Sequence, residues 1–510
     1  MTLQLDNQFK RQYNLLQFIR THQSKNLTLS DLSQKLGTSK PTLRKDIDII
    51  NHSLPTIDFQ ITYNEQGFLQ IDPQEISVDS VITILAKDTT IYRMMDLLLH
   101  NKTYSTEQLS DHLMISRSSI FNIIRHMNEV LKEYRISIAT GPLTFIGKEE
   151  DIRFLLFSFY SSFGDSQIID SDSNHHAHSI IAHGRKSGIT FLHFSHFRFS
   201  LWLSIAKVRG QSKNFCHFNT STIDLVKKNR GYHLIEPLIA SYYSSLFKLT
   251  IPESESLWLY LVFLHCVSYS NGQGLDEERT YAFRCQEDAV VVDAVQRFLL
   301  QVFPKQMLDN GALDKIEAFL INTRLLSKMS PSYEMTSVAL IDLMKEKYPE
   351  LFHLWLQHLE RLKVHPMFEF THLDHLAASL TTFHATILRI KSQQPLRVIV
   401  ALQSCPSMDD YIIQEAELLF LRQISVKFLI EQPVTKKEIN DHQANLIICN
   451  YDLHVNEDFP CPIHRLPNIP TQEDWTLLMD RITHLNSATS TTNYTGYFYS
   501  LGYLFIKNTH

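Results

Sequence analysis

The sequence predicts a mainly α-helical protein of several domains, and three observations support this fold class. The chain has 510 residues, and since domains usually hold about 100–200 residues, about three to five domains are expected. Glycine and proline are scarce, at 14 and 17 residues, which favours helices over β-rich repeats. The spacing of apolar residues is helical over most of the chain and changes to alternating strands and helices only near the C-terminus.

Composition and charge exclude several classes of protein. With 44% apolar and 20% charged residues, the chain has the composition of a globular protein and not of a disordered one. Six cysteines without a CxxC pair argue against a disulfide scaffold and a zinc site, and they favour a reducing compartment. The N-terminus lacks the apolar segment of a signal peptide, and no apolar stretch reaches the roughly 20 residues that span a bilayer. We therefore expect a cytoplasmic protein without membrane contact.

Residues 28–51 and 105–128 look like two copies of one unit. Chemically matched residues recur at a constant offset of 77 positions: Leu32 with Leu109, Leu36 with Leu113, Ser39 with Ser116, Leu43 with Ile120, Ile47 with Ile124, and Leu54 with Leu131. Chance rarely keeps one register over six matched pairs. The sequence therefore predicts an internal duplication.

Each copy predicts a helix-turn-helix. In the first copy, Gly37 suits the left-handed end of a short helix, and Ser39 offers a side-chain cap for a second, longer helix. In the second copy, Ser105 and Gln108 have the spacing of a capping box, and Ser116 caps the longer helix. A short helix, a tight turn and a longer amphipathic helix together form the helix-turn-helix motif.

A predicted β-hairpin follows each copy. Residues 59–71 and 135–147 each contain two short alternating strands around a turn with a glycine. A helix-turn-helix followed by such a hairpin is a winged helix. Two winged helices in tandem suit a protein that contacts two half-sites or successive grooves of DNA.

The solvent face of each longer helix carries the candidate DNA contacts. These are Ser39, Lys40, Thr42, Arg44 and Lys45 in the first copy, and Ser116, Arg117, Ser118, Ser119, Asn122 and Arg125 in the second. Lys, Arg, Ser and Thr reach phosphates, and Arg and Asn also read base edges. Residues 1–145 hold 15 basic and 15 acidic side chains, and the net charge of the chain is −6, so affinity must come from local clustering. The alternative is that these units dock proteins and the cations are merely solvated.

The middle of the chain is predicted to be helical. Glu149 and Arg153 open a strongly apolar helix, after which residues 161–179 have the composition of a polar loop. Residues 185–390 show helical periodicity, and a breaker at 271–278 splits them into two blocks of similar length.

Histidines are numerous, with 25 in the chain. Those in the polar loop, His175, His176 and His178, lack matching carboxylate or cysteine ligands, so we expect no bound metal there. Near the helical segments lie His193, His196, His265, His372 and His375. A neutral imidazole can accept a phosphoryl group, and the added negative charge can reorder a helix interface. From spacing alone, a structural histidine remains the alternative for each of them.

The last part of the chain changes to an α/β pattern. Buried strands are expected at 397–402, 425–430 and 444–450, and helices at 407–423 and 471–486. This alternation predicts a small parallel sheet, with Ser407 as a helix cap. Cys405 follows the first strand, where α/β sites form, but no glycine-rich loop accompanies it. We therefore expect no catalytic residue and no enzyme.

The order of these parts resembles the Mga/AtxA family of transcriptional regulators of Gram-positive bacteria. The resemblance rests on the duplicated helix-turn-helix, the junction GKEEDIRFLLFSFY at 147–160, the two histidine-bearing modules and the α/β terminus. It implies two all-α phosphotransferase-regulated domains (PRDs) and a C-terminal domain that resembles a phosphotransferase IIB component and serves in dimerisation. The implied domains are winged helices at 1–75 and 76–150, PRD-like modules at 151–278 and 279–392, and a IIB-like domain at 393–510.

The resemblance also implies regulatory histidines. The phosphoryl acceptor of the first module maps to His196 and that of the second to His375, and His265 is a further module-type position. The sequence departs from the family pattern at Ser195, where an aspartate usually precedes the histidine. Arg209 is the candidate for the arginine that usually follows. The IIB cysteine motif is degenerate, so we expect that domain to be structural.

The sequence therefore predicts a DNA-binding transcriptional regulator, typical of virulence or sugar-use genes. Its expected partners are promoter DNA, a second copy of itself, and the general phosphotransferase proteins that phosphorylate PRDs; no cofactor or metal is expected. A PRD-type RNA-binding antiterminator is a second hypothesis, although such proteins begin with a small all-β domain. A phosphotransfer protein that uses Cys405 or a histidine is the third.

Overall fold

The computed structural model describes residues 7–21, 27–53, 59–64, 67–72, 78–163, 168–186, 195–247, 251–266, 289–309, 313–363, 365, 367–392, 396–403, 406–420, 424–451, 459–482 and 485. The chain divides into two compact units, residues 1–381 and 382–510, and each is described by itself. Among the described residues, no helix is long and apolar enough to cross a membrane. Leu54, His193, Cys405 and the breaker at 271–278 lie outside the described residues.

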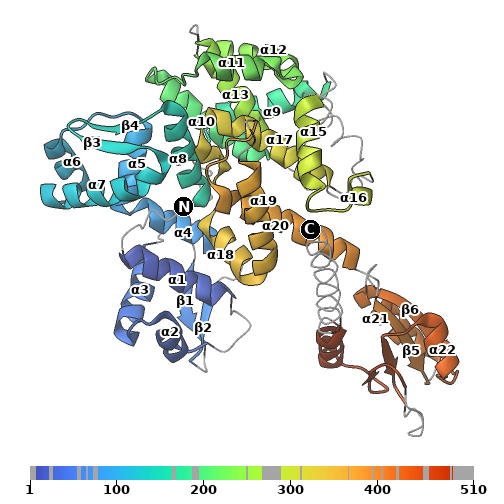
Figure 1. Ribbon diagram of the computed structural model, residues 1–510. Coiled ribbons are helices and arrows are strands. Elements are labelled where there is room, and N and C mark those ends of the chain that lie inside the picture. Colours follow the sequence, from blue (N-terminus) through green and yellow to red (C-terminus); the bar gives the residue numbers. More distant parts are fainter. Residues whose placement is uncertain are drawn as a thin grey trace. The chain divides into compact units, whose positions relative to one another are not determined.

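The first helix-turn-helix and its hairpin form as the sequence predicts (Figure 1). Gly37 ends the short helix with a φ of +60°, and Ser39 caps the longer one. The elements are α1 (Asn7–Thr21), α2 (Leu29–Leu36), α3 (Lys40–His52), β1 (Gln60–Tyr63) and β2 (Leu69–Asp72). The two strands pair antiparallel. Helix α1, which the sequence analysis did not predict, packs against α2, α3 and the helix that follows the hairpin.

The second copy repeats this arrangement. It comprises α4 (Val78–Lys87), α5 (Thr90–Leu99), α6 (Thr106–Leu113), α7 (Arg117–Leu131), the short 3-10 helix η1 (Lys132–Tyr134), β3 (Ser137–Thr140) and β4 (Leu143–Ile146). The expected capping box of Ser105 and Gln108 is present. Matched apolar residues are buried in both copies, each at most 3% exposed: Leu32 and Leu109, Leu43 and Ile120, Ile47 and Ile124. The duplication seen in the sequence is therefore a duplication of structure.

The remainder of the first unit is helical, as predicted. It contains α8 (Glu149–Ser162), α9 (Ser171–Lys186), α10 (His196–Gln211), α11 (Thr220–Lys228), α12 (Arg230–Phe247), α13 (Glu253–His265), α15 (Ala289–Leu299), α16 (Lys305–Asp309), α17 (Asp314–Met329), the 3-10 helix η3 (Pro331–Glu334), α18 (Val338–Lys347), α19 (Pro349–Leu362) and the first part of α20 (Leu373–Ser392). Helix α8 is buried along most of its length. Its Phe157 stacks on Trp202 of α10, with ring centroids 4.2 Å apart, and Trp202 in turn meets Trp258 of α13.

The prediction of a polar loop at 161–179 was wrong over its second half, because α9 begins at Ser171. Asp170 starts this helix: its carboxylate accepts a hydrogen bond from the backbone N–H of Ser173 at 2.9 Å, as an N-cap does. Ala177 and Ile180 are buried against α10 and α12. The segment was predicted as a loop because most of its residues are polar and only a narrow face of the helix is buried.

The second unit holds a four-stranded parallel sheet, which confirms the predicted α/β class. The strands β5 (Leu396–Leu402), β6 (Ile424–Ile430), β7 (Leu446–Cys449) and β8 (Ile463–Arg465) lie in the order β6-β5-β7-β8. Helix α21 (Pro406–Phe420) and the helical segment 472–482 cover one face, and α22 (Lys436–His442) covers the other. Both β8 and α22 were missed. Ser407 was wrongly predicted as a cap, because Pro406 already occupies the first helical position.

Candidate nucleic-acid interface

The longer helix of each motif begins at a serine whose hydroxyl closes the first turn. The Ser39 hydroxyl accepts a hydrogen bond from the backbone N–H of Thr42 at 3.4 Å, and Ser116 accepts from Ser119 at 3.1 Å. The hydroxyl oxygens also pair, 2.8 Å apart in both copies. Thr42 and Ser119 are half-buried in these caps. They therefore help to position the start of the helix, in addition to their predicted role as DNA contacts.

The face of α3 is cationic. Lys40, Arg44 and Lys45 are exposed, and none of them has an ion-pair partner among the residues that the structure describes. Three unpaired cations within six residues can neutralise neighbouring backbone phosphates without losing an internal contact.

The face of α7 has a different chemistry. Arg117 forms an exposed ion pair with Glu107 of α6. Arg125 donates from Nη2 to the Asn122 side-chain oxygen at 3.1 Å, which holds these two predicted DNA contacts together. Phe121, which directly precedes Asn122 on the same helix, is 49% exposed. Ser118, also exposed, shares a hydroxyl contact with Ser116.

Aligned at the offset of 77, the two faces are not equivalent. The exposed positions correspond as Lys40 to Arg117, Arg44 to Phe121, Lys45 to Asn122 and Asp48 to Arg125. The first position is cationic in both copies. At the others, the first copy offers simple charge, whereas the second offers an aromatic ring, an amide and a guanidinium.

An asparagine that the sequence analysis missed fixes each wing to its helix. The side-chain amide of Asn51 donates to the carbonyl of Ile61 at 3.1 Å and accepts from the Ile61 N–H at 2.9 Å. Asn128 does the same with Ile138, at 3.1 and 2.7 Å. Both asparagines and both isoleucines are related by the offset of 77. The alignment of the two copies could therefore have pointed to this contact.

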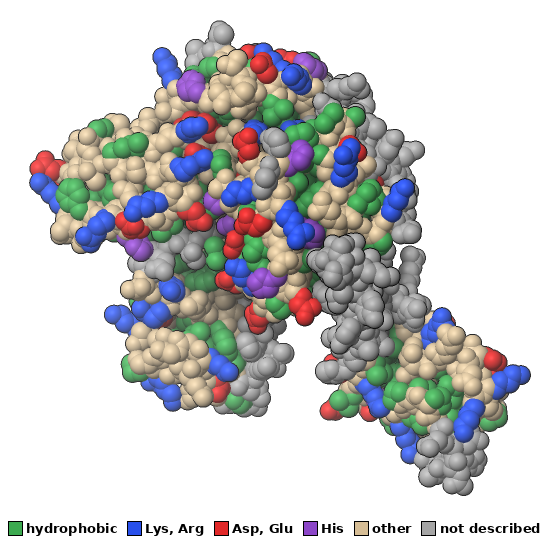
Figure 2. All heavy atoms as spheres, viewed as in Figure 1, with side chains coloured by type: hydrophobic (Ala, Val, Ile, Leu, Met, Phe, Trp, Pro, Cys, Tyr) green, Lys and Arg blue, Asp and Glu red, His purple; other side chains and the backbone are tan. Residues whose placement is uncertain are grey.

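Basic and acidic side chains are interspersed on the face of the molecule that Figure 2 shows, with no single extended basic patch. This agrees with the even balance of charges over residues 1–145. Binding of a polyanion would therefore depend on the short helix faces.

The three candidate phosphoryl acceptors lie in different surroundings. His196 is the first residue of α10, its ring centroid is 3.6 Å from that of His178, and its Nε2 has no hydrogen-bond partner among the described residues. Burial, with the neighbouring His178, lowers the pKa of His196. Arg209 lies at the other end of α10, bound to Glu149, so its guanidinium does not face His196.

His265 ends α13 beside the guanidinium of Arg198, whose Nη2 is 3.0 Å from the ring Nε2. The indole N–H of Trp202 donates to the Nδ1 of His265 at 3.2 Å. Burial and the Arg198 cation lower the pKa of His265 well below its ordinary value. This imidazole is therefore neutral and already hydrogen-bonded.

His375 lies in the first turn of α20 and is 7% exposed. Its Nε2 is 3.9 Å from a carboxylate oxygen of Glu133 in η1, the short helix that directly follows α7. The neighbouring His372 ring lies 5.6 Å away between centroids. The structure thus brings a predicted regulatory histidine of the second helical module next to the end of the second predicted DNA-contacting helix, which the sequence did not reveal.

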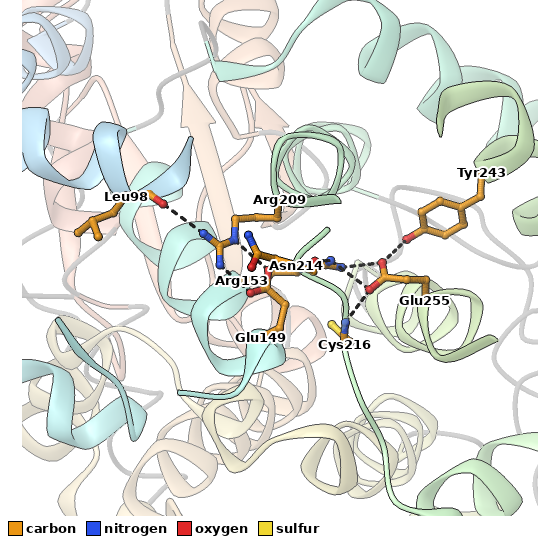
Figure 3. Close-up of polar contacts among 8 residues, drawn as sticks. All are labelled: Leu98, Glu149, Arg153, Arg209, Asn214, Cys216, Tyr243 and Glu255. Atoms are coloured by element: carbon orange, nitrogen blue, oxygen red, sulfur yellow. Dashed lines mark hydrogen bonds and ion pairs between the residues drawn. The ribbon is translucent and has the colours of Figure 1, made fainter. Parts of the chain in front are cut away.

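A buried ionic network joins the second helix-turn-helix to the helical region (Figure 3). Arg153 of α8 is wholly buried and donates to both carboxylate oxygens of Glu255 on α13, at 2.9 and 3.1 Å. Its Nε donates to Glu149 at 3.1 Å. Arg209 of α10 also binds Glu149, at 2.7 and 2.9 Å, and donates to the carbonyl of Leu98 in α5 at 3.1 Å.

The remaining polar contacts complete this network. Glu255 accepts further hydrogen bonds from the backbone N–H of Cys216 at 2.7 Å and from the Tyr243 hydroxyl at 3.3 Å. The Arg153 guanidinium lies 4.4 Å from the ring centroid of Trp258. Because each buried charge is paired and hydrogen-bonded, α5, α8, α10 and α13 are held in one arrangement.

Comparison with known proteins identifies both repeats. Residues 11–62 match the helix-turn-helix domain model, and residues 74–160 match the Mga helix-turn-helix domain. The "Anthrax toxin expression trans-acting positive regulator" of Bacillus anthracis is 21% identical over 481 residues, which cover 93% of this chain and 98% of that protein. The chain is therefore similar to Mga/AtxA-family transcriptional regulators over most of its length.

Two further regulators are similar to this chain over most of its length. "Capsule synthesis positive regulator AcpB" of Bacillus anthracis is 21% identical and covers 92% of the chain and 98% of its own length. "Transcriptional regulator ManR" of Bacillus subtilis is 22% identical, over 85% of the chain and 69% of its own length. The Mga match spans α4 to α8, so it includes the α7 face and the Glu149 and Arg153 end of the buried network.

Proposed function

We propose that this protein is a DNA-binding transcriptional regulator that contacts promoter DNA through α3 and α7. The observation that carries the proposal is the pair of serine-capped helices, each with an exposed polar and cationic face and each tied to its own wing. Two of the three relatives are named positive regulators, which favours activation of transcription. The predicted contacts are Ser39, Lys40, Thr42, Arg44, Lys45, Ser116, Arg117, Ser118, Ser119, Asn122 and Arg125.

The two helices have different tasks in this proposal. Helix α3 presents the exposed cations Lys40, Arg44 and Lys45, so it anchors the protein on phosphates and contributes little sequence preference. Helix α7 presents Phe121, Asn122 and Arg125, whose side chains suit a thymine methyl group, adenine and guanine. Sequence selection therefore rests on the second winged helix.

Binding assays with duplex DNA and hairpin RNA test the proposal. We expect the duplex to bind and the double variant Arg117→Ala/Arg125→Ala to lose specific binding at fixed salt. The control is Arg93→Ala/Arg297→Ala, which removes two exposed arginines, each of which is paired with an aspartate. Arg44→Ala/Lys45→Ala should weaken binding to all sequences alike and reduce the salt dependence by about two phosphate contacts. Preference for hairpin RNA would favour the antiterminator, and equal binding by all variants would exclude both helix faces.

Regulation in this proposal is by phosphorylation of histidines in two PRD-like modules, with His196, His265 and His375 as acceptors. A phosphoryl group on the Nε2 of His375 would place negative charge beside Glu133, at the end of α7. Repulsion there would shift the population between two arrangements of the second winged helix. The α/β unit, which we propose to be IIB-like, would hold two copies of the chain together.

Mass spectrometry after incubation with general phosphotransferase proteins tests the regulatory half. Phosphohistidine at one of the three positions, with altered promoter binding by the same sample, is the expected result. Loss of the modification in the matching His→Ala variant identifies the acceptor. Absence of phosphohistidine would leave the DNA-binding half standing alone. Analytical ultracentrifugation of residues 1–510 and of the same chain without residues 393–510 tests the dimer.

A further inference from the structure

We propose that Glu133, His372 and His375 form a binding site for a divalent first-row transition metal ion, with Zn²⁺ as the best match. One ligand atom from each of the three side chains lies within 4.8 Å of those of the other two. Two imidazoles and one carboxylate are the donor set of three-ligand zinc sites, which keep a fourth position for water. The site stands on side-chain geometry, and it holds whether or not the chain binds DNA.

The backbone around the two histidines is held in place. The carboxylate of Glu334 accepts hydrogen bonds from the backbone N–H groups of Thr371 at 2.8 Å and His372 at 2.7 Å. His372 and His375 are separated by three positions at the start of α20, so both side chains project from the same end of that helix. The ligands therefore sit on a fixed element and would need little reordering when a metal binds.

A second contact sets the orientation of the His375 ring. Its Nδ1 accepts a hydrogen bond from the backbone N–H of Thr336 at 2.9 Å and lies 3.1 Å from the carbonyl oxygen of the same residue. These contacts hold the ring in one orientation, with its Nε2 3.9 Å from a carboxylate oxygen of Glu133. Metal binding through Nε2 would place the ring proton on Nδ1, where the Thr336 carbonyl can accept it, as outer partners of ligating histidines do.

The charges around the site suit a cation. A metal ion binds the neutral imidazole, and His375 is buried and His372 half-buried, which disfavours a charged ring. The nearby cation, Arg135, is bound to the buried carboxylate of Asp151 at 2.6 Å. Glu133 is exposed, which leaves the metal a route from solvent.

A bound metal would have two consequences. It would join η1, directly after α7, to the start of α20, and so fix the end of the predicted DNA-reading helix to the second helical module. It would also occupy the Nε2 of His375, the atom that a phosphoryl group would need. Metal binding and phosphorylation at His375 would therefore exclude one another.

Titration of the full chain with Zn²⁺ by calorimetry, and with Co²⁺ by visible absorption, tests the site. We expect one equivalent that binds more tightly than the rest, with a Co²⁺ spectrum typical of nitrogen and oxygen ligands. His372→Ala and His375→Ala should each weaken this equivalent by about tenfold or more, and Glu133→Gln should weaken it less. The metal should raise the melting temperature of the wild type but not of His372→Ala.

The matched control is His175→Ala/His353→Ala, which removes two exposed histidines that are not part of the cluster, among the 25 in the chain. This control should keep the tight equivalent. Equal loss in the control, or unchanged affinity in both single histidine variants, would overturn the proposal. If the histidine variants do not fold, Glu133→Gln decides, because its side chain is exposed: unchanged affinity there would also overturn it.

Discussion

Asn128 at the end of α7 forms two hydrogen bonds with the backbone of Ile138 in β3, and Asn51 repeats both with Ile61. In each copy the asparagine amide takes the place of a neighbouring strand. It therefore fixes the angle between the predicted DNA-contacting helix and its wing, which no apolar contact would define as closely.

We predict that Asn128→Ala destabilises the second winged helix by about 1–3 kcal/mol, because the Ile138 N–H and carbonyl lose their partners in a half-buried position. Thermal unfolding should show a lower midpoint. Asn122→Ala is the control on the same helix; its side chain is exposed, so it should leave the midpoint unchanged while changing DNA selectivity. A midpoint that is equal for wild type and Asn128→Ala would contradict the role given to this asparagine.

The sequence allowed the duplication to be predicted because its signals are local. Ser39, Gly37 and Ser105 each act within four residues, so caps and turns were visible without the fold. The parallel sheet was visible because β5 is apolar on both faces. By contrast, Arg153 was recognisable as a charge in an apolar helix, but its partner Glu255 lies 102 positions away, and spacing carries no information at that range.

The errors also have physical causes. Helix α9 buries only a narrow stripe, so its Ser- and Asp-rich surface resembles a loop in sequence. Strand β8 has three residues, too few for an alternating pattern. The meeting of Glu133 with His375 depends on how α7 and α20 pack, which is a tertiary property of the chain.

Met114 ends α6 at the position that corresponds to Gly37 and has a φ of +55°. A side chain in the left-handed region costs free energy that glycine avoids, and Met114 is 92% exposed, so it loses no packing when replaced. We predict that Met114→Gly raises the unfolding free energy by about 0.5–1 kcal/mol. Gly37→Ala, at a φ of +60°, should have the opposite sign. Thermal midpoints that move in the same direction for both variants would contradict this account.

Arg117 forms an exposed ion pair with Glu107. In the proposed complex this ion pair competes with the backbone phosphates of DNA for the arginine guanidinium. We predict that Glu107→Gln raises affinity for promoter DNA a few-fold, since it frees the guanidinium and removes a negative charge beside the duplex. The effect should shrink as salt rises. Glu129→Gln is the matched control, because that carboxylate is equally exposed but paired with Lys132 at the far end of α7. Equal gains in both variants would show a general charge effect and not a specific one.

Glu150 in α8 is 2% exposed, and burial, with the adjacent Asp151 carboxylate, raises its pKa to about 7 from an ordinary 4.5. Between pH 4.5 and about 7, Glu150 keeps its proton in the folded chain and releases it in the unfolded chain. The unfolding free energy should therefore fall as pH rises from about 4.5 to 7, and the loss is complete above 7. Glutamine mimics the protonated acid. We predict that Glu150→Gln stabilises the protein at pH 8 by about 1–3 kcal/mol and has little effect at pH 4.5.

The adjacent Glu149 provides the control for this prediction. Its carboxylate binds both Arg153 and Arg209, so its charge is required in the folded state. Glu149→Gln should destabilise the protein at pH 8, where Glu150→Gln stabilises it. The two variants at the two pH values give four shifts of the thermal midpoint relative to the wild type. Shifts of opposite sign at pH 8 are expected if Glu150 is a buried, protonated acid and Glu149 is an ionised, paired one. If Glu150→Gln lowers the midpoint at pH 8, then its carboxylate is charged and paired in the folded chain.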